Sequence, residues 1–139
     1  MEIKVMKRGF FNRILGRPAT GLPSQPDCWT QENGTIRIDL AKAPELAEPG
    51  GALRIEDEKL DQRVLVVHGM DGSYHAFANS CTHGGRRLDP VPGTGTVQCC
   101  SVGHSTFDYQ GKLLAGMAKE DITRYACSVE NGMLTVDLA

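Results

Sequence analysis

Two short stretches of sequence are the main indication of the fold and the kind of site in this chain. They are Cys-Thr-His-Gly-Gly-Arg-Arg-Leu at 81–88 and Cys-Ser-Val-Gly-His-Ser-Thr-Phe-Asp at 100–108. Each carries one thiol and one imidazole, and the four candidate ligands are Cys81, His83, Cys100 and His104. Thiolates and imidazoles bind zinc and iron–sulfur centres, so this pattern predicts a metal site made by two loops.

Each of the two stretches follows a segment with the sequence features of a strand. Residues 35–40 alternate between polar and apolar with a period of two, as a half-buried strand does. Further strands are expected at 52–56, 63–68, 73–79, 96–100, 105–109, 122–130 and 133–138, with one helical turn within 41–48. Asp71-Gly72 and Asn131-Gly132 are hairpin signals. These features predict an all-β fold, either an antiparallel β-sandwich or a small barrel.

Composition limits the class of protein. The chain has 139 residues, of which 40% are hydrophobic and 23% charged, as in a single globular domain. No run is long and apolar enough for a transmembrane span, and a net charge of −2 gives no basic excess for nucleic acid. Five cysteines cannot all pair with one another, and no secretory leader is recognisable. We therefore expect a cytoplasmic protein.

Charge is distributed unevenly along the chain. Residues 1–20 contain five basic residues and one acidic residue, so they carry +4 and the remainder carries −6. Apolar residues at helical spacing in this segment would form one face of an amphipathic helix. Residues 1–20 are thus a candidate docking segment for a partner or a membrane surface, or an end that packs on its own domain. We expect a basic N-terminal segment and linker at 1–28 and one domain at 29–139.

The two loops resemble those of the Rieske [2Fe-2S] family. The family pattern is Cys-x-His-x-Gly-x-x-Leu, then Cys-x-x-His-Gly and an aromatic residue. Cys81, His83, Gly85 and Leu88 match every defined position of the first motif. The resemblance covers about residues 29–139. It implies a Rieske-like β-sandwich or set of small barrels, with a cluster-binding subdomain of two hairpin loops at about 80–117.

The second loop departs from the family pattern. Gly103 stands where the family has its histidine, and His104 stands where the family has glycine. Phe107 keeps its distance from Cys100, so the change is an exchange without insertion. Three outcomes follow: His104 ligates iron after a small adjustment of the loop, the cluster is bound abnormally, or the domain carries no cluster. Four surviving candidate ligands argue against the last outcome.

The resemblance implies a one-electron carrier holding a [2Fe-2S] cluster through Cys81, His83, Cys100 and His104. Such a chain is a ferredoxin-like component or a small subunit of an oxidoreductase system, and by itself is not expected to be an enzyme. Its partner would be a reductase or a terminal oxidoreductase. Two alternatives stay open: a cluster-free Rieske-like structural subunit of the nitrite reductase small-subunit type, and a module that binds a single zinc ion.

Residues around the ligands suggest how the site is tuned. Arg86 and Val102 occupy the positions where some family members have a bracing disulfide, so that brace is excluded. Phe107 lacks the hydroxyl of the usual tyrosine, whereas Ser105 retains one. The covering third loop has Gly116-Met117 in place of Gly-Pro. Fewer donors to sulfur predict a low to intermediate reduction potential.

The remaining cysteines and histidines have simpler interpretations. Cys127 is in step with Tyr125 and Val129 and is expected in the core. Cys99 precedes the candidate ligand Cys100 and is expected to point to the opposite face of its strand and pack in the core, with a role as an alternative ligand left open. Cys28 is expected to be a free thiol near the linker. His68 and His75 are expected to be exposed and to face each other across the Asp71-Gly72 hairpin.

Overall fold

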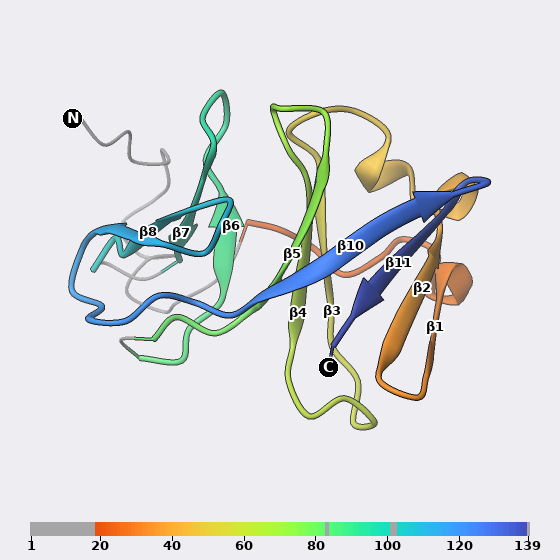
Figure 1. Ribbon diagram of the computed structural model, residues 1–139, viewed down its shortest axis with the longest axis horizontal. Coiled ribbons are helices and arrows are strands. Elements are labelled where there is room, and N and C mark those ends of the chain that lie inside the picture. Colours follow the sequence, from red (N-terminus) through yellow and green to blue (C-terminus); the bar gives the residue numbers. More distant parts are fainter. Residues whose placement is uncertain (1–18, 83, 101–102, 139) are drawn as a thin grey trace.

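The computed structural model describes residues 19–82, 84–100 and 103–138. The described chain forms two antiparallel sheets that lie side by side (Figure 1). The large sheet has the strand order β1-β2-β11-β10-β5-β4-β3, and the small sheet has the order β6-β7-β8-β9. The expected all-β antiparallel architecture is confirmed.

The strands are β1 Trp29–Glu32, β2 Thr35–Asp39, β3 Ala52–Ile55, β4 Val64–His68, β5 Tyr74–Ala78, β6 Leu88–Pro90, β7 Thr96–Cys99, β8 Thr106–Asp108, β9 Leu113–Ala115, β10 Arg124–Glu130 and β11 Met133–Asp137. Three 3₁₀ turns complete the described elements: η1 Pro26–Cys28, η2 Leu40–Lys42 and η3 Pro44–Leu46. Every strand expected from the sequence is present, and η2 and η3 supply the expected helical turn.

Three strands, β1, β6 and β9, were not among those expected from the sequence. β6 contains Asp89 and Pro90, which are residue types that strands disfavour. Pro90 is accommodated because β6 is the edge strand of the small sheet, where a missing N–H breaks no ladder. β9 has only three residues, all of them half-buried, so it shows no alternation.

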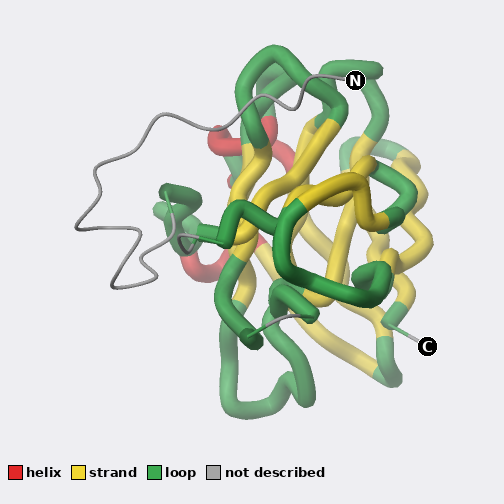
Figure 2. The backbone as a smooth tube through the Cα atoms, turned by 90° about the vertical axis from the view of Figure 1, so that its left-hand side faces the viewer, coloured by secondary structure: helices red, strands yellow, loops and turns green. Residues whose placement is uncertain are grey.

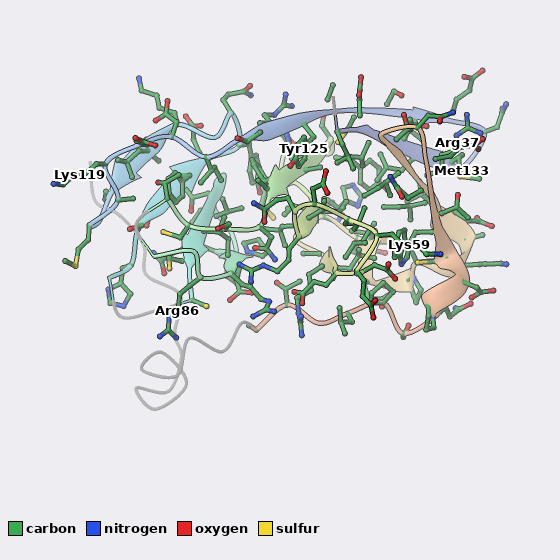
Figure 3. All side chains as sticks on the ribbon, turned by 90° about the horizontal axis from the view of Figure 1, so that it is seen from below. Arg37, Lys59, Arg86, Lys119, Tyr125 and Met133 are labelled. Carbon is green, nitrogen blue, oxygen red and sulfur yellow. The ribbon has the colours of Figure 1, made fainter. Side chains whose placement is uncertain are left out.

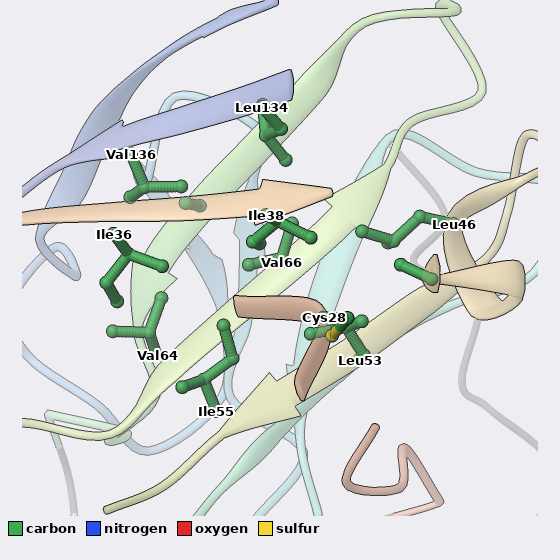
Figure 4. Close-up of a cluster of buried hydrophobic side chains, with 12 residues drawn as sticks. Cys28, Ile36, Ile38, Leu46, Leu53, Ile55, Val64, Val66, Leu134 and Val136 are labelled. Atoms are coloured by element: carbon green, nitrogen blue, oxygen red, sulfur yellow. The ribbon is translucent and has the colours of Figure 1, made fainter. Parts of the chain in front are cut away.

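Strand β4 separates two hydrophobic cores. All four residues 64–67 are fully buried, because successive side chains of a strand point to opposite faces. Val64 and Val66 pack in the core of the large sheet, whereas Leu65 and Val67 pack in the core shared with the small sheet. Figure 4 shows the first of these cores. The small sheet therefore shares a hydrophobic core with one face of the large sheet.

Residues 19–21 are bound to both sheets. The backbone N–H groups of Ala19 and Thr20 donate to the buried Asp89 carboxylate of β6, at 2.9 and 2.8 Å. The carbonyl of Gly21 accepts from the N–H of Arg54 on β3. Part of the expected linker is thus hydrogen-bonded to the domain. Most of the expected basic segment, residues 1–18, lies outside the described residues.

Cys28 is a free thiol, as expected, and it is also buried. It is only 2% exposed and packs in the core of the large sheet (Figure 4). Pro26 begins the turn η1, and the turn carries Cys28 inward. Burial raises the pKa of this thiol, with Glu45 and Asp27 adding to the effect.

The expectation that His68 and His75 are exposed and face each other was wrong. Strand register pairs His68 with Tyr74, and the two rings stack at 4.5 Å. His75 is 3% exposed, stacks on Tyr109 at 4.4 Å, and bonds to the Asp71 carboxylate at 2.9 Å. His75 belongs to β5, and Tyr109 follows β8. The stack therefore connects strand β5 of the large sheet to the segment that follows β8 of the small sheet.

Candidate metal centre

The first loop connects β5 to β6 and is closed at its base. The N–H of Cys81 donates to the carbonyl of Arg86, and the N–H of Gly85 donates to the carbonyl of Cys81, each at 2.7 Å. Gly85 has a φ of 72°, a left-handed conformation that favours glycine. The glycine of the first motif therefore turns the chain back onto Cys81.

The second loop connects β7 to β8. Its base is the 2.8 Å bond from the N–H of Cys99 to the carbonyl of Ser105. His104 lies inside the loop with a φ of 53°, the left-handed region that few non-glycine residues adopt. The hydroxyl of Thr106 donates to the carbonyl of His104 at 2.8 Å and supports this backbone.

The two loops are joined to each other through Arg86 and Arg87. The carbonyl of Arg86 accepts the N–H of Cys81, and the next carbonyl, that of Arg87, accepts the N–H of Cys100 at 2.9 Å. Cys81 and Cys100 thus flank the same two-residue segment, although they lie far apart in sequence. Both cysteines are buried, at 2% and 1% exposure.

A third loop covers the second. The N–H of Ala118 donates to the hydroxyl of Ser105 at 3.0 Å. A Cβ added to Gly116 would lie 2.3 Å from the Cα of Ser105, so only glycine permits this approach. Thr82 of the first loop donates its hydroxyl to the carbonyl of Glu120 at 2.6 Å. All three loops are therefore tied together at one end of the molecule, which faces the viewer in Figure 2.

A half-buried ion pair holds the first loop on the large sheet. Glu56, just after β3, accepts two hydrogen bonds from the guanidinium of Arg87, at 2.6 and 2.8 Å. Arg54 adds a third at 2.7 Å. The hydrogen bond from Arg87, together with Arg54, lowers the pKa of Glu56 to about 2. Arg87 is thereby fixed by its side chain while its carbonyl holds Cys100.

The exposed surface at this end carries charged and apolar side chains. Arg86 and Lys119 both lie at the end that carries the loops, whereas Arg37 and Met133 lie at the opposite end (Figure 3). Met117 is 60% exposed and lines a hollow together with Thr82, Lys119 and Glu120.

The four predicted ligands are placed as follows. Cys81 and Cys100 are brought to the same segment and buried, and His104 is half-buried in the second loop. His83 lies outside the described residues. Within the described ranges, no three His, Cys, Asp or Glu side chains gather as a single metal ion would require.

A polar atom below the first loop lacks a partner. Asn79, which follows β5, is fully buried, and no described group hydrogen-bonds its side-chain nitrogen, Nδ2. Neither Asn79 nor Glu56 was singled out by the sequence. Glu56 is far from Arg87 in sequence, so no local pattern could find it. The only sequence feature that pointed to Asn79 was its position two residues before Cys81.

The two other cysteines behave largely as expected. Cys99 is buried in the core shared by the sheets, which confirms its packing role. Cys127 packs at the edge of the other core and is half-buried. Desolvation raises the pKa of the Cys127 thiol to about 11, so it remains protonated at neutral pH.

Comparison with known proteins identifies the pattern. A family model for the Rieske [2Fe-2S] domain matches residues 38–126. The plasma-membrane Rieske protein PetC3 of the cyanobacterium Synechocystis PCC 6803 has a similar structure, with a TM-score of 0.52 and 29% sequence identity. That match covers 62% of this chain and 85% of PetC3. No curated protein sequence matches the chain.

Two further structures share the fold. The ferredoxin of carbazole 1,9a-dioxygenase from Nocardioides aromaticivorans IC177 matches with a TM-score of 0.56 and 20% identity, over 66% of this chain and 88% of the ferredoxin. The quaternary ammonium Rieske monooxygenase CntA matches with a TM-score of 0.54 and 20% identity, over 68% of this chain. This chain spans only 29% of the monooxygenase.

Proposed function

We propose that this protein, because it belongs to the Rieske [2Fe-2S] domain family, transfers single electrons between redox proteins. The observation that carries the proposal is the pair of consecutive carbonyls, Arg86 and Arg87, that hold the N–H groups of Cys81 and Cys100. Two buried thiols are thereby presented from two loops that only the fold brings together.

The proposed ligands are Cys81 and Cys100 for one iron and His83 and His104 for the other. A [2Fe-2S] cluster bound there would supply a reversible one-electron couple. Soft, charged thiolates and neutral imidazoles suit the two halves of such a cluster. The protein would shield the cluster from water, because both cysteines are buried within loops that are hydrogen-bonded to one another.

The described residues are compatible with this group. Two buried thiols lie on two loops joined through consecutive carbonyls, and thiolates are ligands of iron–sulfur clusters. The side-chain nitrogen of Asn79, two residues before Cys81 in sequence, is a donor for which the described protein groups supply no acceptor.

The backbone of the second loop explains how the exchange at 103–104 is accommodated. His104 adopts the left-handed conformation suited to the glycine that the family has there. The backbone of the loop is therefore compatible with the family pattern, and the imidazole extends from position 104 instead of position 103. We propose that His104 ligates iron from this shifted position.

The proposed partner is a reductase or a terminal oxidoreductase. Arg86 and Lys119 are exposed at the loop end, where they would pair with acidic side chains of a partner. Among the structural neighbours, one ferredoxin is described in complex with its oxygenase. We propose a component of such a system rather than an enzyme in its own right, acting in the cytoplasm. No helix among the described residues has the length and apolar character to cross a membrane.

Analysis of anaerobically purified protein tests the proposal. Two irons and two acid-labile sulfides per chain, with a red-brown visible spectrum, support the electron carrier. One zinc and no colour support the zinc module. A protein free of metal even after reconstitution with iron and sulfide supports the structural subunit.

A further inference from the structure

Asn79 follows β5 and lies just before the first ligand loop. Its side chain is fully buried, yet its Nδ2 has no hydrogen-bond partner among the described residues. A buried donor left unpaired is costly, so native structures rarely tolerate one. This unpaired donor directly precedes the first ligand loop.

The orientation of this amide is fixed. Its Oδ1 accepts the N–H of Leu88 at 2.7 Å, so exchanging the two amide atoms would set one donor against another. The backbone is held as well: Asn79 donates its N–H to the carbonyl of Arg63 at 2.8 Å, and Arg63 returns its Nε to the carbonyl of Asn79 at 3.2 Å. Asn79 cannot turn outward to find water without breaking these bonds.

The surroundings point toward sulfur. Asn79 lies two residues before Cys81, and Leu88, which it caps, follows the carbonyl that holds Cys100. Cys81 and Leu88 belong to the same buried cluster of side chains. The amide therefore lies where the segments carrying the two cysteines approach each other. A sulfur of a metal group held by these cysteines would supply the missing acceptor.

We propose that Asn79 donates Nδ2–H to a sulfur of the cluster, either the Cys81 thiolate or an inorganic sulfide. This inference rests on the proposed function. A donor stabilises the reduced, more negative form more than the oxidised form. Asn79 is thus assigned as a residue that tunes the potential, partly in place of the hydroxyl that Phe107 lacks. Loss of the donor should shift the equilibrium about fivefold to tenfold toward the oxidised form.

Selective ¹⁵N labelling of asparagine tests the bond directly. The chain has four asparagines, and two of them, Asn33 and Asn131, occupy exposed turns of the large sheet. The Asn12→Gln variant removes the label from the N-terminal segment. Pulsed electron paramagnetic resonance of the reduced, labelled Asn12→Gln protein should show a weak ¹⁵N coupling from Asn79. The backbone nitrogen of Asn79 is an unsuitable source because its hydrogen goes to Arg63.

The Asn79→Asp variant supplies the second readout, since a carboxylate keeps the acceptor for Leu88 and loses the donor. We expect it to lose the ¹⁵N coupling and to lower the reduction potential, whereas the control Asn131→Asp should change neither. If the cluster loads fully and the labelled Asn12→Gln protein shows no asparagine coupling, Nδ2 binds something other than sulfur and the inference is wrong. This result stands even if Asn79→Asp fails to fold. A protein that never binds iron and sulfide refutes the proposed function itself.

Discussion

The guanidinium of Arg87 donates two hydrogen bonds to the carboxylate of Glu56, at 2.6 and 2.8 Å, while the carbonyl of the same arginine holds the N–H of Cys100. The Glu56 side chain is 20% exposed and that of Arg87 is 31% exposed, so the pair is partly shielded from water. One residue therefore couples the large sheet to the second ligand loop.

Glu56→Gln should loosen this coupling. The variant leaves Arg87 partly buried without its counter-charge, which should lower the free energy of unfolding by about 1–3 kcal/mol. Urea denaturation of the wild type and the variant measures the difference. Glu58→Gln, at an exposed position of the following loop, is the matched control and should change stability by less than about 0.5 kcal/mol. Equal stability of both variants would show that the ion pair contributes nothing.

The same pair predicts a pH dependence. The pKa of Glu56 falls from 4.5 to about 2 in the folded protein, so folding favours the ionised carboxylate. Its contribution is complete above the unfolded pKa and is lost as the pH falls from about 4.5 to about 2. The stability advantage of the wild type over Glu56→Gln should therefore be constant from pH 7 to 5.5 and should shrink below pH 4.5. An advantage that persists at pH 2.5 contradicts this assignment.

Restoring the family order in the second loop should be tolerated. In the Gly103→His, His104→Gly double variant, glycine takes the left-handed position at 104. A Cβ at 103 meets only ordinary contacts, the nearest being the sulfur of Met117 at 3.7 Å. We expect full cluster content and stability equal to the wild type or up to about 1 kcal/mol higher. The single variant His104→Gly should lose the cluster. Loss of iron from the double variant would show that this loop requires its histidine at 104.

Gly116→Ala should detach the third loop. The added methyl meets the backbone of Ser105 at 2.3 Å, and the φ of 102° is unfavourable for alanine. Strain and overlap together should cost about 2–4 kcal/mol. Gly132→Ala isolates the strain, because its φ is 76° and nothing lies within 4 Å of the new methyl. That control should cost only about 1 kcal/mol. Similar losses of stability in both variants would mean that the third loop moves away from the added methyl group at no energetic cost.

Local sequence patterns predicted most of the fold. The alternation in β2, the apolar run in β4 and the Asp71-Gly72 turn are features of neighbouring residues, and all three were found as expected. Patterns of this kind fail where tertiary contacts decide. β6 is a strand despite Asp89 and Pro90, because it pairs with β7 and tolerates proline at the sheet edge.

The candidate site, too, contains residues that the sequence identified and residues that only tertiary contacts reveal. Spacing of cysteine and histidine identified Cys81 and Cys100, and the structure joins them through Arg86 and Arg87. Their supporting residues depend on distant pairings: Glu56 reaches Arg87 across 31 positions, so no motif could reveal it. His75 was expected to be exposed and is buried instead, because Tyr109, which follows β8, stacks on it.

Mössbauer spectroscopy of ⁵⁷Fe-enriched, reduced protein tests the central claim most directly, since it reports the ligands of each iron. We predict two sites of equal intensity, one ferric with sulfur ligands only and one ferrous with the parameters of mixed nitrogen and sulfur coordination. Two irons that both show sulfur-only coordination, or iron that never enters the protein, would contradict a cluster held by two cysteines and two histidines.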